Sequence, residues 1–573
     1  MPKHPSHVSS LEVRPLGNKQ PYNSPTPNSQ PAFFFLPNNH ASPHPTPLDH
    51  GRPQSRLPPA GLAADLVDGN YSTAAVWTTA LLAGALALSL LLTPRLDPRE
   101  PPVVKPTIPL VGHIIGIIRH QSDYHRIIHS ANPTKPIATL PMLNGKMYTI
   151  YDPHLVQTAL RFRIASFEPF VIDFAQKTFS LSKETFSKVR GPNVFNDFND
   201  AIHSSFQAPM LHKMNVHFLA SISAKMDPIS FGTVRVDEVN SGREELVDGG
   251  LRVENLYLWC RDVMTLATTK PLYGDHDPFG PQPHLVNDLW LFEESVPYFL
   301  LSLFPSITMP KAYRARSKLQ ALMGKYYTED HDINDPTTSQ LVKNRAGALR
   351  KHGFTGKRSG TARGDPTECR DSQCEVEAAA VISDSEGKRT ATFNIASFDE
   401  KLPLLISCYR ETMRLSNHSV SMRRIMQDMT ITGADGQSYL LKKGVDLQLP
   451  AGVTHHDRSA WGQDFDEFDA ERFLQKAGDA ETERRRKAAY FPFGGGRHLC
   501  PGRNFAFAEI LGFMAVLVLG FDVEPLGMRF GEMKMLGGQL ASGTVRPEKH
   551  GKGLGGKITR RSGWENVDWR FEC

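Results

Sequence analysis

The pattern of apolar and polar positions divides most of the chain into helical stretches and a few short strands. Apolar residues recur at helical spacing over 314–328, 402–415 and 503–518, which predicts a helix in each range. Apolar and polar residues alternate over 146–151 and 428–432, which predicts short strands of small sheets. The pattern therefore predicts a mainly α fold with a minor β part.

An uncharged apolar run lies near the N-terminus, at residues 71–93. About twenty such residues are enough to span the hydrocarbon layer of a bilayer. Arg95 and Arg99 follow the run while Asp65 and Asp68 precede it, so the positive-inside tendency places the rest of the chain in the cytosol. We expect one transmembrane helix here. A cleaved signal peptide and a buried core helix are the alternatives, and the long polar segment upstream counts against the first.

The segments on either side of this run differ from each other in composition. Residues 1–70 are rich in Pro, Ser, Asn and His, which is typical of a disordered segment; an extension of the gene model is the alternative. Residues 94–109 contain the sequence PPVVKPTIP, and prolines at this density predict a stiff, extended hinge. Residues 110–573 are long enough for one large catalytic domain.

Composition and charge narrow the classes of protein. Hydrophobic residues make up 40% and charged residues 22%, so the chain can bury a sizeable core. The formal net charge is only +5, and no basic stripe with interleaved aromatic residues indicates a nucleic-acid partner. The six cysteines are sparse and unevenly spaced, which favours a reducing compartment over a disulfide framework. Cys369 and Cys374 lie close together, but no second Cys or His pair completes a zinc site.

The segment FPFGGGRHLCPGR, at 491–503, carries the strongest chemical signal. Its glycines allow a sharp turn and a close approach to a flat ligand. Pro501 suits the first turn of a helix, so Cys500 should lie at a helix N-terminus, where the dipole and free N–H groups stabilise a thiolate able to ligate iron. A phosphate loop is excluded because no Gly-Lys-Ser/Thr follows. A nucleophilic cysteine would need a nearby base, and His498, two residues away, is poorly placed to be one. A cysteine with only a structural role would leave the flanking pattern unexplained.

This segment resembles the haem-binding loop of the cytochrome P450 superfamily, whose pattern is Phe, Gly, any, Gly, any, basic, any, Cys, any, Gly. The matching residues are Phe493, Gly494, Gly496, His498, Cys500 and Gly502. The resemblance implies haem b (iron protoporphyrin IX), with Cys500 as the axial thiolate and His498 as a donor to a haem propionate. The family usually has Arg in place of His498, and a histidine carries a weaker, pH-dependent charge. Arg497 beside it either compensates or faces solvent.

Further motifs agree with this resemblance in order along the chain. Glu411 and Arg414 lie three residues apart, on one face of a predicted helix, and the sequence FDAERF at 468–473 resembles the family's meander motif. The resemblance therefore implies a buried charge network of Glu411, Arg414 and Arg472; an exposed ion pair is the alternative. It also implies an arginine that enters a small sheet and contacts a propionate. Arg423 is our candidate, with Arg424 in reserve, and His212 is a weaker candidate for another propionate contact.

The family's long central helix should lie between about 345 and 395, where an acid and a threonine relay protons to dioxygen. Residues 353–369 are instead rich in Gly and Arg and lack apolar periodicity, and Pro366 would break a helix. We therefore expect a truncated central helix and assign no proton-relay residues. Three explanations are open: a mis-predicted exon or frameshift, membership of the branch that rearranges peroxides, and loss of activity.

The resemblance implies a monooxygenase, an oxidoreductase that acts on paired donors and incorporates molecular oxygen. Its substrate would be an apolar small molecule (a lipid, sterol or secondary metabolite), and its electrons would come from a flavoprotein of the NADPH-cytochrome P450 reductase type. We expect a single-pass protein of the endoplasmic reticulum membrane with a cytosolic catalytic domain. A dioxygen-independent isomerase or dehydratase and an inactive haem-binding relative are the alternatives. Residues 415–423 resemble the sterol 7-hydroxylase and prostacyclin-synthase branch.

Overall fold

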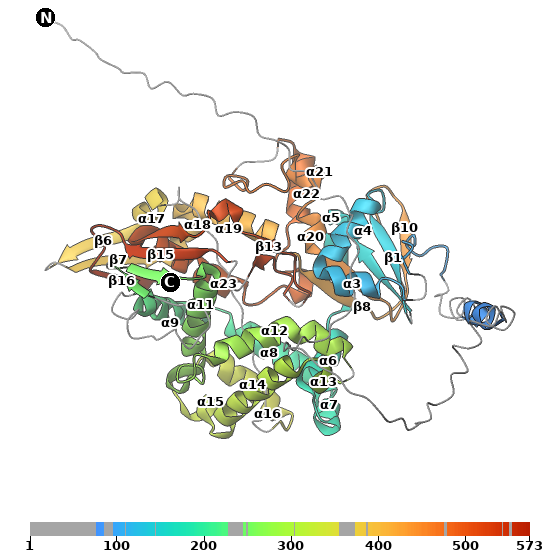
Figure 1. Cartoon of the computed structure of the whole chain (residues 1–573), viewed down its shortest axis with the longest axis horizontal. Coiled ribbons are helices and arrows are strands. Elements are labelled where there is room, and N and C mark those ends of the chain that lie inside the picture. Colours follow the sequence, from blue (N-terminus) through green and yellow to red (C-terminus); the bar gives the residue numbers. More distant parts are fainter. Residues whose placement is uncertain are drawn as a thin grey trace, which may run out of the picture. The chain divides into compact units, whose positions relative to one another are not determined.

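The computed structural model separates the chain into residues 1–76 and residues 77–573, and almost all of what it describes lies in the second unit. The described residues are 76–84, 87, 96–108, 111–143, 145–226, 245–247, 250–302, 304–354, 373–385, 388–474, 478–540, 542–548 and 553–572. Within them the fold is mainly α with several small sheets, as the sequence predicts (Figure 1).

A five-stranded sheet forms one end of the second unit, where helices α3, α4 and α5 lie against it (Figure 1). Its order is β1-β2-β11-β8-β3, and only the β2–β11 pair is parallel. The hairpin of β9 and β10 is separate from it. Strands β2 and β9 confirm the two predicted strands. The bounds of these elements are α3 Ile114–His120, α4 Tyr124–Ala131, α5 Pro153–Arg161, β1 Ile137–Met142, β2 Gly145–Ile150, β3 Ala165–Ser166, β8 Val420–Ile425, β9 Met429–Thr432, β10 Ser438–Leu441 and β11 Asp446–Pro450.

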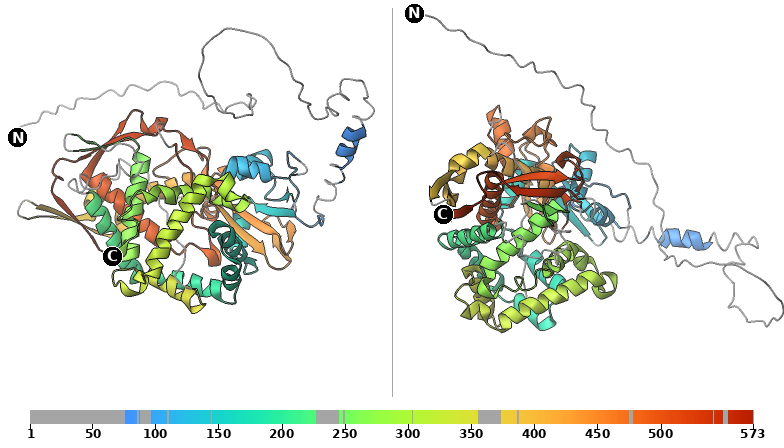
Figure 2. Two further views of the ribbon diagram at one scale, coloured as in Figure 1. Left: turned by 60° about the horizontal axis from the view of Figure 1, so that its bottom comes forward. Right: turned by 60° about the vertical axis from the view of Figure 1, so that its left-hand side comes forward.

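A second part of the unit is entirely helical (Figures 1 and 2). Its core lies between α11, α12, α14 and α16, where large aromatic side chains such as Trp290, Phe299 and Tyr326 are buried. Helix α14 confirms the helix predicted at 314–328. The bounds are α6 Glu168–Phe179, α7 Lys183–Val189, α8 Val194–Ser205, α11 Leu256–Tyr273, α12 Leu285–Leu301, α13 Pro305–Thr308, α14 Pro310–Thr328, α15 His331–Asn334 and α16 Gln340–Lys351.

The largest core surrounds helix α23, Arg503–Gly520, which packs against α9, Met210–Met226. Among the described residues, α23 alone is long and apolar enough to cross a membrane, but 61% of it is buried inside the fold, as in the core helix of a folded domain. Beside it lies a sheet in the order β12-β15-β5-β4. These strands are β4 Glu245–Val247, β5 Gly250–Val253, β12 Phe521–Leu526 and β15 Gly555–Arg560. Helix α23 confirms the helix predicted at 503–518.

The region expected to hold a long central helix contains other elements. Helix α16 ends at Lys351, and the next described segment, from 373, gives the short helix α17, Gln373–Ala379, and a hairpin of β6, Ala380–Ser385, and β7, Lys388–Asn394. Strand β7 pairs in parallel with β16, Val567–Glu572, near the C-terminus. The described part of this region therefore has no long helix. Residues 355–372, with most of the segment singled out above, lie outside the described residues.

The remaining elements connect these parts and carry the candidate site. Helix α19, Pro403–Ser416, confirms the helix predicted at 402–415. The others are α18 Phe398–Lys401, α20 Ala451–Thr454, α21 Arg458–Trp461, α22 Ala480–Ala489, β13 Met535–Leu536, β14 Arg546–Pro547 and single turns of 3-10 helix at 121–123, 274–276, 395–397, 496–498 and 530–532.

The predicted transmembrane segment lies largely outside the described residues. Residues 76–84 are helical and exposed, and their large side chains include Val76, Trp77, Leu81 and Leu82. Residues 96–108 of the predicted hinge contain no helix, and backbone hydrogen bonds join Pro102 and Val104 to Thr139 of β1.

Candidate active site

The glycine-rich loop joins α22 to α23 and places Cys500 three residues before the latter helix. The Cys500 N–H donates to the Phe493 carbonyl at 3.1 Å, which closes the loop. Gly494 and Gly496 have φ of +72° and +62°, the left-handed region that favours glycine. A Cβ at Gly496 would lie 1.9 Å from the Leu160 carbonyl oxygen at the end of α5. Gly496 is therefore needed for the turn and also permits the loop to pack closely on α5.

The Cys500 thiol is half-buried at the wall of a cavity. Burial raises its pKa, although hydrogen bonds from the Gly502 and Arg503 N–H groups and the Arg503 charge act in the opposite direction. The helix terminus therefore favours the thiolate, as expected, but in the metal-free chain burial outweighs this effect. A metal ion that binds this sulfur displaces the proton, because ligation requires the thiolate.

The structure places Glu411, Arg414 and Arg472 in one buried network. Glu411 accepts from Arg414 Nε and Nη2, both at 2.7 Å, and from Arg472 Nε at 2.9 Å. The two side chains of the Glu-x-x-Arg pair are 0% exposed, so the alternative of an exposed ion pair is excluded. The arginines also donate to backbone carbonyls of 455–467, the segment between α20 and the meander region. The network thus joins α19 to the chain that leads to the cysteine loop.

Arg423 and His498 lie on the same side of the cavity as Cys500. Arg423 is 3% exposed, and Nη1 donates to the Ser421 hydroxyl and the Met422 carbonyl, but buried Nη2 has no partner among the described residues. Burial lowers its pKa to about 10. Burial, with nearby cations, lowers the pKa of His498 to about 4, so this ring is neutral and still able to donate one N–H. A buried cation without an acidic partner is suited to an anionic group of a ligand.

The other three candidates for a propionate contact do not line the cavity. Arg424 points to the other face of β8, where it pairs with Asp446 at 2.7 Å and with Asp173 at 3.5 Å. His212 is exposed on α9 and does not line the cavity, so the prediction of a propionate contact there is wrong. Arg497 is exposed and cannot replace His498.

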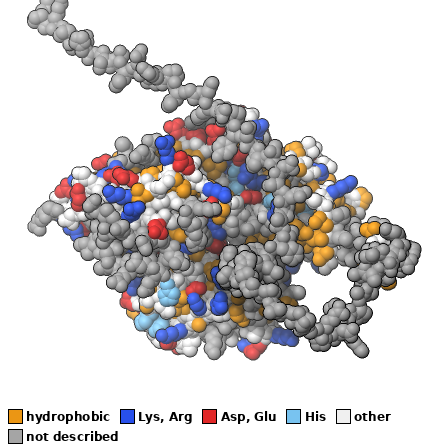
Figure 3. All heavy atoms as spheres, in the orientation of Figure 1, with side chains coloured by type: hydrophobic (Ala, Val, Ile, Leu, Met, Phe, Trp, Pro, Cys, Tyr) orange, Lys and Arg blue, Asp and Glu red, His pale blue; other side chains and the backbone are white. Residues whose placement is uncertain are grey.

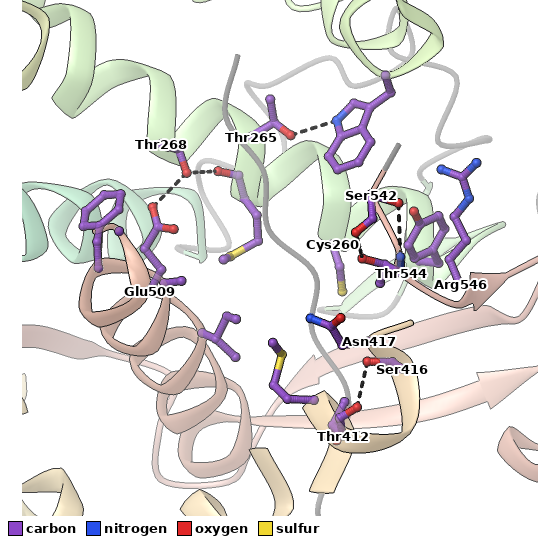
Figure 4. Close-up of a pocket in the computed structure, with 18 of the residues that line it drawn as sticks. Cys260, Thr265, Thr268, Thr412, Ser416, Asn417, Glu509, Ser542, Thr544 and Arg546 are labelled. Carbon is purple, nitrogen blue, oxygen red and sulfur yellow. Dashed lines mark hydrogen bonds between the residues drawn. The ribbon is translucent and has the colours of Figure 1, made fainter. Parts of the chain in front are cut away.

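The cavity behind the cysteine has a volume of about 1450 Å³. Its walls come from α11, α12, α14, α16, α19, β8, the cysteine loop, α23 and the segment 542–547, and they are mainly aromatic and aliphatic. Five of the six residues of the loop motif line the cavity, and Gly496 is the exception. Arg423 lines the cavity as well. Figure 4 shows polar side chains on opposite sides of part of this space, Thr268 and Glu509 on one side and Ser542, Thr544 and Arg546 on the other.

Comparison with known proteins identifies the family. The family model described as cytochrome P450 matches residues 377–550, which include the charge network and the cysteine loop. A cytochrome P450 monooxygenase of Gibberella zeae is 35% identical, and the match covers 83% of this chain and 92% of that protein. The chain belongs to the cytochrome P450 family. Relatives that carry this name are monooxygenases, oxidoreductases that incorporate oxygen.

Two further matches extend the comparison. The human 7-alpha-hydroxycholest-4-en-3-one 12-alpha-hydroxylase is 24% identical over 78% of this P450 and 90% of its own length. The solved structure of retinoic acid-bound cyanobacterial CYP120A1 aligns with 81% of this chain and 100% of its own, with a TM-score of 0.50 at 16% identity. The structural likeness supports the P450 fold alone.

The alignment lengths show that this chain has gaps relative to two of its relatives. The match to the Gibberella protein runs over 504 positions but takes in 83% of this P450, about 476 of its 573 residues, so about 28 positions lack a residue here. The match to the human hydroxylase runs over 483 positions and takes in 78%, about 447 residues, which leaves about 36. These two relatives therefore contain, within the aligned ranges, a few tens of residues that have no counterpart in this P450.

A buried acid that the sequence analysis did not single out lies in the cavity wall of this P450. Glu509, on α23, is 4% exposed, and its carboxyl group is bonded to the Thr268 hydroxyl of α11 at 3.0 Å. The Thr268 hydroxyl has a single proton and donates it to the Met264 carbonyl. A protonated Glu509 can then donate its own proton to the Thr268 oxygen, so both contacts are hydrogen bonds. Burial raises the pKa of Glu509 to about 8. Its signal in the sequence was its position as the one acid in an apolar helix, but the threonine partner, 241 residues away, carries no signal.

This carboxyl group predicts a pH-dependent gain in stability for Glu509→Gln. The unfolded chain ionises near pH 4.5, whereas the folded chain keeps the proton until about pH 8, so the native state loses relative stability as pH rises through this range. Glutamine stays neutral at every pH. We expect a gain of up to about 3 kcal/mol in unfolding free energy at pH 7 and none at pH 4, measured by denaturant unfolding. The exposed Glu400→Gln serves as control; an equal gain at both pH values would contradict the assignment.

Proposed function

We propose that this P450 is a haem-dependent monooxygenase that hydroxylates an apolar small molecule with dioxygen and reductase-supplied electrons. The observation that carries the proposal is the convergence of Cys500, Arg423 and His498 on one large, mainly apolar cavity. The unpaired Nη2 of Arg423 fits a propionate, and the Cys500 sulfur fits the iron. When bound, haem with a thiolate ligand supplies dioxygen activation and O–O cleavage.

The protein's own residues have separate tasks in this proposal. Cys500 would hold the haem iron through its deprotonated sulfur. Arg423 and His498 would hold the propionates, Arg423 as a charged donor with an unbonded Nη2 and His498 as a further ring N–H donor. Glu411, Arg414 and Arg472 keep the cysteine loop in place through the backbone of 455–467. The apolar walls exclude water and bind the substrate.

The apolar walls of the cavity and the name of one relative support a substrate class. Mainly apolar walls favour a lipid, a sterol or a secondary metabolite. The 12-alpha-hydroxylase among the relatives acts, by its name, on a cholestenone, which supports an alicyclic lipid. This agrees with the resemblance of 415–423 to the sterol-hydroxylase branch.

Membrane attachment and the electron donor are further parts of the proposal. The apolar run at 71–93 supports a single membrane span, with the catalytic domain on the cytosolic face of the endoplasmic reticulum. A flavoprotein of the NADPH-cytochrome P450 reductase type would then supply electrons. The basic run at 484–487 offers it little free charge, because it lies on α22 and three of its four residues pair with acids. On the face in Figure 3, basic and acidic side chains are interspersed.

One observation favours a second function, a dioxygen-independent isomerase or dehydratase. Within 340–354 and 373–394 the described chain has no long helix to carry the family's acid and threonine. The two functions differ in what they need for turnover. We expect product from an apolar substrate with NADPH, reductase and dioxygen, and a loss of product under argon. Rearrangement of an added lipid hydroperoxide without reductase, together with no NADPH-dependent product, would support the second function and contradict the first.

A further inference from the structure

The buried arginines of this P450 differ in how completely their N–H groups are bonded. Arg414 is fully buried and donates to Glu411 and to the carbonyls of His455, Phe465 and Glu467. Arg546 is 6% exposed, and its Nη1 donates to Glu294 Oε1 at 3.0 Å. Its Nε is buried without a partner, and its Nη2 has none among the described residues. A guanidinium group has five N–H donors, and leaving them unbonded in a protein interior is unfavourable, so this arginine lacks acceptors.

The missing acceptor would lie in the cavity. Arg546 begins β14, and its side chain lines the same cavity as Cys500 together with Ser542 and Thr544. Figure 4 shows these three residues next to one another at one side of the space. Ser542 Oγ accepts from the Thr544 N–H at 3.2 Å, while its own O–H has no acceptor among the described residues. We call Ser542, Thr544 and Arg546 the polar subsite.

The charge of the polar subsite decides which ligand it fits. Glu294, on α12, neutralises Arg546 at 3.0 Å, so a carboxylate in the subsite would meet a second carboxylate nearby. A ketone or hydroxyl oxygen accepts the free N–H and O–H donors and brings no charge with it. Arg423 is the contrasting case, because no acid pairs with it among the described residues and burial alone shifts its pKa. The cavity therefore has two separate binding sites: Arg423 belongs to the site for an anion, and Arg546 belongs to the site for a neutral oxygen.

We propose that the polar subsite binds a neutral oxygen function, a ketone or hydroxyl, of an otherwise apolar substrate. This inference rests on the proposed function, since it concerns the substrate of the same cavity. Binding at the subsite fixes one end of the molecule while the apolar walls hold the rest, and so determines which carbon faces the Cys500 side. The site selects against both a bare hydrocarbon, which leaves the donors unbonded, and a carboxylate, which Glu294 repels.

The test is a binding comparison with three probes of similar length: tridecan-2-one, tridecane and dodecanoate. Trp259 and Trp290 line the cavity, so tryptophan fluorescence of the full chain reports binding with or without haem, and the haem band reports it in loaded protein. We expect wild type to bind the ketone about tenfold more tightly than the alkane, and, in haem-loaded protein where the propionates occupy Arg423, about tenfold more tightly than the carboxylate. Arg546→Met and Ser542→Ala should reduce this preference, because each removes a donor that is free in the cavity, and Glu294→Gln should raise dodecanoate affinity about tenfold by exposing the charge.

Ser416→Ala is the matched control, because Ser416 also lines the cavity but its hydroxyl is already bonded to the Thr412 carbonyl at 2.7 Å. It should leave the ketone preference unchanged. Equal binding of ketone and alkane by wild type, or an unchanged ratio in both Arg546→Met and Ser542→Ala, would overturn the inference. A retained ketone preference in a chain that shows no haem-thiolate band would instead overturn the proposed function and leave the subsite standing.

Discussion

Glu411→Gln should cost about 3–5 kcal/mol of unfolding free energy and abolish haem incorporation, because it leaves two buried guanidinium groups without their shared carboxylate. Glu411 accepts three hydrogen bonds from Arg414 and Arg472, and it accepts a fourth from the Asp469 N–H at 3.3 Å. A glutamine amide offers one acceptor oxygen and turns its NH2 group toward donors. Arg414 has no second acid among its contacts, whereas Arg472 keeps Asp464. The expected loss is a large part of the stability of an ordinary domain.

The measurement is denaturant unfolding of the full chain with haem content determined alongside. Asp446→Asn is the matched control, because Asp446 also pairs with an arginine, Arg424, but both side chains are about a quarter to a third exposed. Such a pair is worth about 0–1 kcal/mol. If the two variants lose similar stability, or if Glu411→Gln retains full haem content, the network does not have the structural role assigned to it.

Cys500→Ser should remove the thiolate signature completely while leaving the fold intact. A serine hydroxyl is nearly the same size as the thiol, so the loop keeps its Cys500 N–H to Phe493 bond and its glycine turns. A neutral hydroxyl does not push electron density onto iron as a thiolate does. We expect the red-shifted band of the reduced, carbon monoxide-bound protein to disappear, with any remaining haem showing the band of a neutral-ligand species.

The control for this variant is a second cysteine of the same cavity. Cys260 lies on α11, is 9% exposed and also lines the space, so geometry alone does not exclude it as the ligand. Cys260→Ala should keep the thiolate band. Loss of that band in Cys260→Ala with its retention in Cys500→Ser would assign the ligand to the other cysteine.

The parts of the site that the sequence predicted are those whose residues lie close together along the chain. The Cys500 loop and the pair of Glu411 and Arg414 were readable from local spacing. Arg472 came from the resemblance of its motif, and the structure brings it to Glu411 across 61 residues. The lack of a helix over 353–369 stays a prediction, because most of that segment lies outside the described residues. The pairing of β7 with β16, residues 388–394 with 567–572, could not be read from the sequence.

Other features depend on contacts that no local pattern carries. The bond from Thr268 to Glu509 spans 241 residues, and Arg546 to Glu294 spans 252. The raised pKa of Cys500 could not be predicted, because the sequence shows the helix terminus but not the burial that outweighs it. Gly496 was expected to make room for a ligand, whereas the nearest obstacle to a side chain there is the Leu160 backbone.

The central claim is that Cys500 binds haem iron as a thiolate in this chain, although the described part of 340–394 has no long helix. The most direct test is the absorption spectrum of the expressed full-length protein, reduced and exposed to carbon monoxide. We expect a strongly red-shifted Soret band that Cys500→Ser abolishes. A purified, folded chain with no haem band, or with only the band of a neutral-ligand species, would contradict it.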